Sequence, residues 1–354
     1  MRAKKNKKLI IIIGIVLTVL LLAGTVVAIL FKNKAKRENE TKEPSSYTSI
    51  DEKKEEKKVT IVNTDSKTRP YAVMINCHNA ALPQAGLDKA YIVYELMVEY
   101  GITRMMALFK DVDVNKIGSV RSARTQYLGY VYENDAIYAH AGGAQDALNR
   151  IASEKINDVD VDGQYGVRDT SLNRAWEHTL FTTTNLLNSA RDSRGFRKDT
   201  DGGLLLKYSA DELDLSGYEN SKVANNISIN YSDYRTSNYK YNAESKTYLR
   251  SMNDTSNIDL VTGEQYKVKN ILVYGVNYSN YTYSGYSAYQ KIDNIGTGEG
   301  YYISNGYAIP IKWEKENEKS KTKYTVAATG KELIVNDGNT YIQIYPANRN
   351  LTID

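Results

Sequence analysis

The chain has a single cysteine, Cys77, among its 354 residues, so no disulfide can form within it. The Cys-x-x-Cys and His-Glu-x-x-His spacings of zinc sites are absent. Histidine is also scarce (His78, His140 and His178), so a protein-only metal site is not expected. We also expect no cofactor. Because Cys77 lies in the apolar run YAVMINC, we expect a small buried core residue rather than a nucleophile.

No cysteine stands at the end of the longest apolar segment, since Cys77 lies far downstream, and this argues against a lipid anchor there. That segment, Leu9–Phe31, runs for 23 residues without a charge, enough for a helix to cross the ~30 Å core of a bilayer. Its length exceeds the ~7–15 residues of a cleaved signal peptide's apolar region, although small residues leave cleavage open. Lys and Arg are slightly more numerous before the segment than after it. We therefore expect a cytoplasmic head, 1–8, a transmembrane helix, 9–31, and a cell-membrane protein whose soluble part is extracytoplasmic.

Most of the chain, residues 59–354, carries no excess of positive charge. Residues 1–58 hold 14 Lys and Arg against 7 Asp and Glu, so 32 basic and 35 acidic residues remain in 59–354. The formal net charge of +4 therefore resides near the N-terminus, which argues against a nucleic-acid partner. Residues 32–67 are mostly Lys, Glu, Ser and Thr with almost no apolar residues, and this composition predicts a disordered stalk.

The chain from residue 68 onward is longer than a single hydrophobic core usually holds, so two domains are expected. In the first, 68–222, the runs YAVMIN, YIVYELMVE, RMMALFK and AIYAHA indicate strands. The first two runs are almost continuously apolar, as in a sheet that is covered on both faces. Helices are indicated by RSARTQYLGYVYEND, by the stretch after Gly142-Gly143 and by TTTNLLNSARD.

The second expected domain, 223–354, shows short alternating strands punctuated by Gly, Asn and Asp. They are ISINYS, TYLRSM, VKNILVYGVNY, GYYIS, YAIPIKW and TYIQIYP. The predicted fold class is α+β: a mixed α/β domain packed against a mainly antiparallel β domain, with the boundary between about Lys207 and Asn225. The run NYSNYTYSGYSAY resembles a tyrosine-dense loop, which could stack on sugar rings or simply reflect composition.

Several runs together resemble the YerB-like family, envelope lipoproteins of Gram-positive bacteria that form a domain of unknown function. They are RPYAVMIN, PQAGLDKAYIVYELMVEYGITR, KIGSVRSAR, YAHAGG, EHTLFTT, LVTGEQYKVKNILV, GTGEGYYISNGYAIPIKW and GKELIVNDGNTYIQIYP. The resemblance covers roughly residues 69–346. It implies a two-part YerB-like fold and an extracytoplasmic, membrane-bound location, but no particular reaction. The chain departs from the family by having a transmembrane segment in place of a lipobox cysteine.

Two arginines of the run VRSAR are three residues apart and would share a helical face. If Ser119 caps this helix, Arg121 and Arg124 lie near its first turn, where cations oppose the helix dipole unless an anion or a carboxylate joins them. The alternative is pairing with carboxylates of the chain itself, such as Glu95 or Glu99.

His140 ends a predicted strand just before Gly142-Gly143 and a helix. Glycines allow a close backbone approach, and a helix start offers free N–H groups, so this resembles a cradle for an anion. The alternative is a buried histidine bonded to a carbonyl. We predict that Arg121, Arg124, His140, Gly142 and Gly143 converge on one anion-accepting site.

Glu95 and Glu99 lie about 13 Å apart along a strand, at ~3.3 Å per residue. Glycosidases with two carboxylates need ~5–9.5 Å, so these two are not expected to act as such a pair unless the chain bends sharply. The candidate supporting residues are Glu95, Glu99, Arg104, Asp169 and His178.

The sequence thus favours a membrane-anchored envelope protein that binds an anionic cell-wall component, such as a cell-wall polymer, or a partner protein of the envelope. The alternative is an enzyme acting on peptidoglycan, with His140 or a carboxylate as general acid or base. No nucleophile elbow or convincing carboxylate pair is present, so whether the protein is an enzyme stays open.

Overall fold

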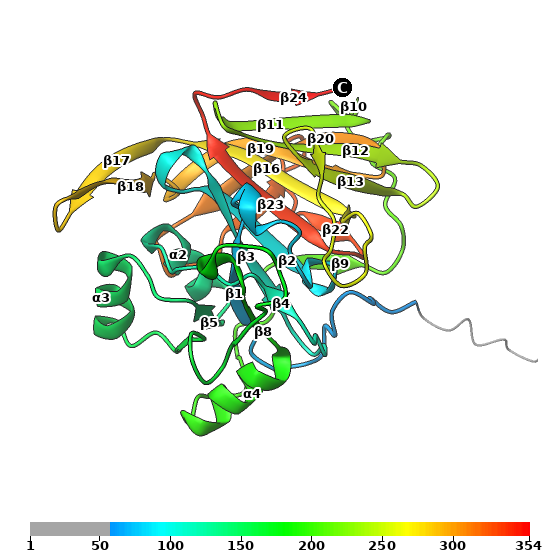
Figure 1. Cartoon of the computed structure of the whole chain (residues 1–354). Coiled ribbons are helices and arrows are strands. Elements are labelled where there is room, and N and C mark those ends of the chain that lie inside the picture. Colours follow the sequence, from blue (N-terminus) through cyan, green and yellow to red (C-terminus); the bar gives the residue numbers. More distant parts are fainter. Residues whose placement is uncertain (1–56) are drawn as a thin grey trace, which may run out of the picture. The chain divides into compact units, whose positions relative to one another are not determined.

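The structure, a computed structural model, describes residues 57–354 (Figure 1). The expected basic head, the transmembrane helix and most of the stalk lie outside the described residues. Within the described part of the chain, no helix is long and apolar enough to cross a membrane. Residues 57–354 cluster into one compact unit.

The last part of the predicted stalk is packed rather than disordered. Val62 is buried in the core. The carboxylate of Asp337 accepts hydrogen bonds from the backbone N–H of Thr60 and of Ile61, at 2.9 and 3.0 Å. The few apolar residues of this stretch therefore suffice to dock it once a partner surface is present.

A large mixed sheet forms the centre of the fold. Its strand order is β10 (Lys222–Val223), β20 (Tyr307–Lys315), β19 (Gly296–Ser304), β16 (Asn270–Val276), β23 (Thr340–Pro346), β2 (Ile92–Met97), β3 (Thr103–Phe109), β1 (Tyr71–Asn76), β5 (Ile137–His140) and β6 (Asp158–Asp160), with β21 (Lys323–Val326) beside β20.

A second sheet covers one face of the large sheet. Its order is β14 (Thr255–Ser256), β13 (Thr247–Met252), β12 (Arg235–Asn242), β11 (Asn226–Ser232) and β24 (Leu351–Ile353), with β15 (Lys267–Val268) beside β13. Smaller sheets pair β17 (Tyr278–Tyr283) with β18 (Tyr286–Ile292), β9 (Lys207–Ser209) with β22 (Ile334–Asn336), and β8 (Leu180–Thr182) with both β4 (Ile117–Gly118) and β7 (Val167–Arg168). The α-helices of residues 57–354 are α2 (Thr125–Glu133), α3 (Gln145–Ser153) and α4 (Thr184–Ser193).

Alternation along the strands explains the layers. In β1, Ala72 and Met74 join the hydrophobic cluster that contains Tyr127 of α2. Val73, between them, belongs to the cluster that contains Ile229 of β11. Because successive strand residues point to opposite faces, the central sheet is buried on both sides, as its nearly continuous apolar runs predicted. Figure 1 shows the second sheet on one face and α2 and α3 on the other.

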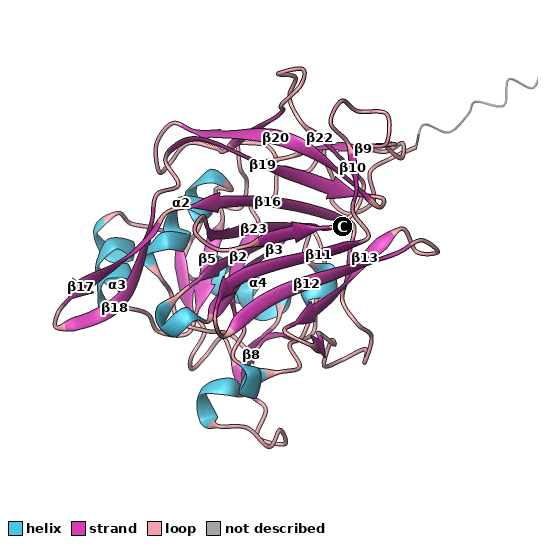
Figure 2. Ribbon diagram, turned by 90° about the horizontal axis from the view of Figure 1, so that it is seen from above, coloured by secondary structure: helices cyan, strands magenta, loops and turns pink. Residues whose placement is uncertain are grey.

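The large sheet passes through both expected domains. Strand β2 pairs in parallel with β23, with Val93 opposite Tyr341, and β23 pairs in parallel with β16. Figure 2 shows these strands side by side in one continuous sheet. The expected boundary between Lys207 and Asn225 therefore separates two segments of sequence that share a sheet and a core. The fold is mostly β with few helices, so the first half of the described chain is less helical than the expected α/β domain.

Most of the expected elements form where the sequence places them, but helix α2 begins later than predicted. Residues 121–124 are extended because their backbone groups pair elsewhere. The N–H of Arg121 donates to the carbonyl of Met74 at 2.9 Å, and that of Ala123 donates to Gly142 at 2.9 Å. Arg124 precedes the first turn in an extended conformation, so Ser119 is not the cap and the two arginines do not share a helical face.

The tyrosine-dense run is also different from the expected loop. It folds into the antiparallel hairpin of β17 and β18, which projects beside α2 and α3 in both views (Figures 1 and 2). The turn at Ser284-Gly285 has positive φ at both residues, as a tight hairpin requires.

Candidate functional site

Three arginines gather between β3 and the extended segment before α2, and we call Arg104, Arg121 and Arg124 the arginine cluster. Arg104 is buried on β3 and donates to the carbonyl of Ser122 at 2.6 Å. Arg124 forms an ion pair with Glu99, in the short 3-10 turn Glu99–Gly101 that follows β2. Arg121 is half-buried and reaches the backbone carbonyl of Glu177 at 3.4 Å.

Positive charge exceeds negative charge in this cluster. Burial is the main cause that lowers the pKa of Arg104, and the charges of Arg124 and Arg121 lower it further. Burial also lowers the pKa of Arg121, although Glu177 acts in the opposite direction. Within residues 57–354, Glu99 is the carboxylate that makes an ion pair with the cluster. An added anion would therefore relieve repulsion among the guanidinium groups.

His140 precedes Ala141, whose backbone pairs with Arg121, but the His140 ring forms contacts outside the arginine cluster. Nδ1 is 2.9 Å from the carbonyl oxygen of Gly142, and Nε2 is 3.2 Å from the carboxylate of Asp158. Only 1% of the residue is exposed. Both ring nitrogens therefore have partners, and the ring is closed off from solvent.

The backbone of Gly142 and Gly143 lies beside the segment of Arg121 and Arg124, but the N–H of Gly142 already has an acceptor. The N–H of Ala141 donates to the carbonyl of Arg121 at 3.1 Å, so the two segments are neighbours. The N–H of Gly142 donates to Asp160 at 3.2 Å. Gly143 pairs with Ala123 in an isolated bridge. The structure thus assembles Arg121, Arg124 and the glycine backbone, while a carboxylate already fills the expected cradle.

The supporting residues do not join one pocket. Asp169 is 2.5 Å from the ammonium group of Lys116, which is the main cause that lowers the pKa of Asp169 to about 2. The ring of His178 contacts the amide of Asn76 at 2.9 Å and stacks on His78, with the ring centres 5.1 Å apart. Asp169, His178 and His140 therefore each have separate partners.

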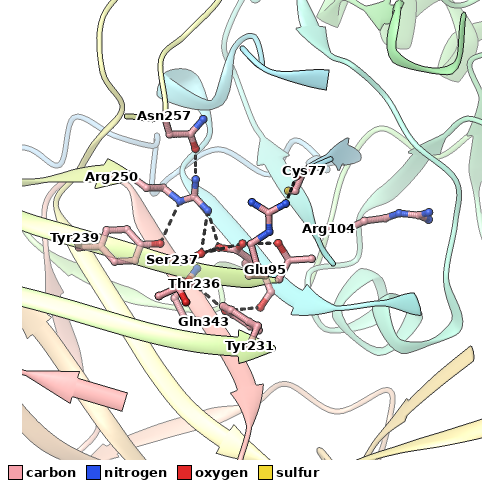
Figure 3. A network of polar contacts seen from close by, with 12 residues as sticks. Cys77, Glu95, Arg104, Tyr231, Thr236, Ser237, Tyr239, Arg250, Asn257 and Gln343 are labelled. Carbon is pink, nitrogen blue, oxygen red and sulfur yellow. Dashed lines mark hydrogen bonds and ion pairs between the residues drawn. The ribbon is translucent and has the colours of Figure 1, made fainter. Parts of the chain in front are cut away.

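Glu95 lies in the interior between the two sheets. It forms a 2.9 Å ion pair with Arg250 of β13, and neither side chain has exposed surface. Ser237 and Thr103 donate further hydrogen bonds to the Glu95 carboxylate, at 3.1 and 2.8 Å. Figure 3 shows Glu95 at the centre of this network, with Arg104 pointing away from it. Although the chain bends after β2, Glu95 and Glu99 serve different arginines and do not act as a pair.

Sequence reasoning missed Arg250 and gave Arg104 only a supporting place. The signal for Arg250 lies in the run TYLRSM, where Tyr248, Arg250 and Met252 alternate onto the buried face. A charged residue at such a position needs a partner inside the protein. Arg104 carries the same signal, because it opens the apolar run of β3. Among residues 57–354, no cluster of three His, Cys, Asp or Glu side chains could hold a metal ion.

Comparisons with known proteins agree with this fold. Residues 58–197 match the N-terminal domain, and 227–342 the C-terminal domain, of the family described as "Protein of unknown function (DUF3048)". The chain is 28% identical over 302 residues to the "Putative lipoprotein YerB" of Bacillus subtilis strain 168, covering 83% of this chain and 84% of that protein.

The crystal structure of YerB from Bacillus subtilis is similar as well. The TM-score is 0.69 at 25% identity, and the likeness covers 82% of this chain and 94% of that one. Both parts of the family are present in matching order. The chain belongs to the DUF3048 family, and the YerB-like resemblance of its sequence is confirmed.

Proposed function

We propose that this protein is a membrane-anchored, extracytoplasmic protein of the cell envelope that binds an anionic cell-wall component through its arginine cluster. The observation that carries the proposal is the charge balance of Arg104, Arg121 and Arg124: within residues 57–354 only Arg124 of the three makes an ion pair, with Glu99. A carboxylate or phosphate would supply the missing negative charge. Arginine forks suit both groups, because each can accept two parallel hydrogen bonds.

Two observations support the location. The uncharged apolar segment Leu9–Phe31 is long enough for a membrane anchor. The similar protein of Bacillus subtilis is named as a lipoprotein, which is also a membrane-attached class. Here a protein segment would replace the lipid, so the anchor differs but the side of the membrane is the same.

The enzyme alternative has less support. A general acid or base must reach a proton on the substrate, whereas His140 is buried and bonded at both ring nitrogens. Glu95 is also enclosed, as the partner of Arg250. A protein partner with an acidic surface remains a second candidate, because the arginine cluster would attract it for the same electrostatic reason.

The proposal is tested by the affinity of the protein for anionic wall material. Arg121→Gln removes one charge from the cluster without breaking the Arg124–Glu99 ion pair. Binding to soluble peptidoglycan fragments with free carboxylates, or to a poly(glycerol phosphate), should weaken about ten- to hundredfold, since a hydrogen bond to a charged group contributes about 1.5–3 kcal/mol. Calorimetric titration at fixed ionic strength measures this loss.

The matched control is Arg349→Gln, which removes the same charge from an exposed pair with Asp233. It should leave the affinity nearly unchanged. Thermal melts of both variants check folding. Equal losses of affinity in the two variants would show that the effect comes from net charge alone. If the unaltered protein did not bind these polymers, the proposal would be wrong for them. Binding of an acidic protein alone would favour the second candidate.

A further inference from the structure

A cleft of about 650 Å³ lies between α2, α3 and the hairpin of β17 and β18. This volume falls within the ~300–1,000 Å³ of typical small-ligand sites. Thr125 and Gly129 line it from α2, Asn149 from α3, and Tyr281, Tyr283 and Ile292 from the hairpin. The cleft is separate from the arginine cluster, although Thr125 follows Arg124 directly in the chain.

Tyrosine hydroxyl groups attach the hairpin to the helices. The hydroxyl of Tyr281 lies 3.0 Å from that of Thr125 and also donates to the carboxylate of Asp146. The amide of Asn149 donates to the hydroxyl of Tyr283 at 2.8 Å. Both rings are thereby held at the wall of the cleft, so a flat ligand would meet aromatic surfaces that are already oriented.

Asp146 adds an acceptor that is not satisfied by the protein. The residue lines the cleft and is 7% exposed. One carboxylate oxygen bonds Tyr281, whereas the other, Oδ1, is buried and has no hydrogen-bond partner within residues 57–354. Such an acceptor is costly unless a donor reaches it. A ligand hydroxyl or N–H group is the chemistry that would satisfy it.

The charged groups that line the cleft oppose one another, since Lys291 and Arg150 lie there together with Asp146 and Glu318. Arg150, which lines one end, is neutralised by Glu318 through contacts of 3.0 and 2.8 Å, and by Glu154 at 2.7 Å. Amide side chains of Gln126 and Asn294 add polar groups without charge. Tyrosine rings, apolar patches, amides and a spare acceptor together suit a sugar ring, which has an apolar C–H face and hydroxyl groups at its edge.

We propose that the cleft between the hairpin and helices α2 and α3 binds sugar residues of a neutral, N-acetylated glycan. The inference deepens the proposed function by naming the glycan part of a cell-wall component, and it rests on that function for the biological setting alone. Tyr283 would stack on a sugar ring, and Asp146 would accept from a hydroxyl or an acetamido N–H. A charged group on the same polymer would reach the arginine cluster beyond Thr125.

The test uses chitotetraose, a neutral oligomer of N-acetylglucosamine, and the full chain kept in solution by a mild detergent. Saturation-transfer NMR and calorimetric titration should show binding. Tyr283→Ala should weaken it about three- to tenfold, as expected for the loss of one aromatic contact. Asp146→Asn should weaken it about tenfold or more, because the charged acceptor is replaced by a neutral amide.

Matched variants separate the explanations. Tyr283→Phe keeps the aromatic ring and loses the hydrogen bond from Asn149, so binding of the glycan should persist. This variant still tests the role of the ring if Tyr283→Ala does not fold. Tyr234→Ala removes an exposed tyrosine from another part of the chain and should have no effect. Arg121→Gln should leave the affinity for this neutral glycan unchanged, which makes failure here distinguishable from failure of the anion site.

The proposal would be overturned by no detectable binding of chitotetraose at millimolar concentration. It would also be overturned if folded Tyr283→Ala and Asp146→Asn bound as tightly as the unaltered protein. Competition of the glycan by an uncharged peptide of similar length, at equal or higher affinity, would assign the cleft to peptides instead.

Discussion

Glu95 and Arg250 form a buried ion pair between the two sheets of this protein. Burial is the largest single influence on the pKa of Arg250 and lowers it, but Glu95 and smaller contributions from neighbouring groups together raise that pKa. Arg250 also donates to Asn257, which in turn donates to Gln84 at 3.0 Å. A buried pair of this kind ties β2 of the large sheet to β13 of the second sheet.

Removing one partner of this pair should be far more damaging than removing both charges. Arg250→Met leaves Glu95 charged and unpaired in the interior, which should lower the free energy of unfolding by about 3–5 kcal/mol. The double variant Glu95→Gln with Arg250→Met keeps hydrogen bonding to Ser237 and should recover most of this loss. Urea denaturation of the unaltered protein, the single variant and the double variant measures the free energy of unfolding of each.

The exposed pair of Arg349 and Asp233 provides the comparison. Arg349→Met should cost no more than about 1 kcal/mol, because solvent screens surface ion pairs. If Arg250→Met cost as little as Arg349→Met, the Glu95 carboxylate would not depend on Arg250 as its partner in the interior.

At the scale of elements, the sequence predicted most strands and the later helices. The continuous apolar run YAVMIN, the alternation in TYLRSM and the N-cap at Thr183, which accepts from the N–H of Leu186 at 3.0 Å, are local signals. The start of α2 could not be predicted in the same way. Residues 121–124 are extended because Met74 and Gly142, distant in sequence, bind their backbone groups.

The hairpin of β17 and β18 gives a prediction at this scale. Tyr281→Phe removes the hydroxyl that bonds Asp146 and Thr125. We expect a loss of about 1–3 kcal/mol, because a buried carboxylate then lacks its donor. Amide hydrogen exchange, followed by mass spectrometry, should accelerate in 278–292 while the central strands remain protected.

Tyr289→Phe is the matched control in the same hairpin. Its ring lies beside Tyr281, with the ring centres 5.6 Å apart, but its hydroxyl makes no hydrogen bond within residues 57–354. Exchange in the hairpin should stay near that of the unaltered protein. Equal acceleration in both variants would show that the hydroxyl bonds do not fasten the hairpin.

At the scale of the whole molecule, the parallel pairing of β2 with β23 decides the architecture. It places Ile92 opposite Thr340, a contact that no local pattern reveals. The composition of the two halves therefore predicted two domains, whereas one sheet runs through both. Contacts between distant segments also explain why only part of the arrangement of the candidate site residues was predicted. The neighbourhood of Arg121, Arg124 and the glycines was expected, but the engagement of His140 with Asp158 was not.

Binding of an anionic wall component at the arginine cluster is the proposal on which the function of this protein rests. Its most direct test is NMR of the arginine Nε–H groups in residues 57–354, during titration with a short poly(glycerol phosphate). If the component binds there, the signals of Arg104, Arg121 and Arg124 should shift in a saturable, salt-sensitive manner, while that of the buried Arg250 should stay in place. Saturable shifts confined to other arginines, with these three unmoved, would contradict it.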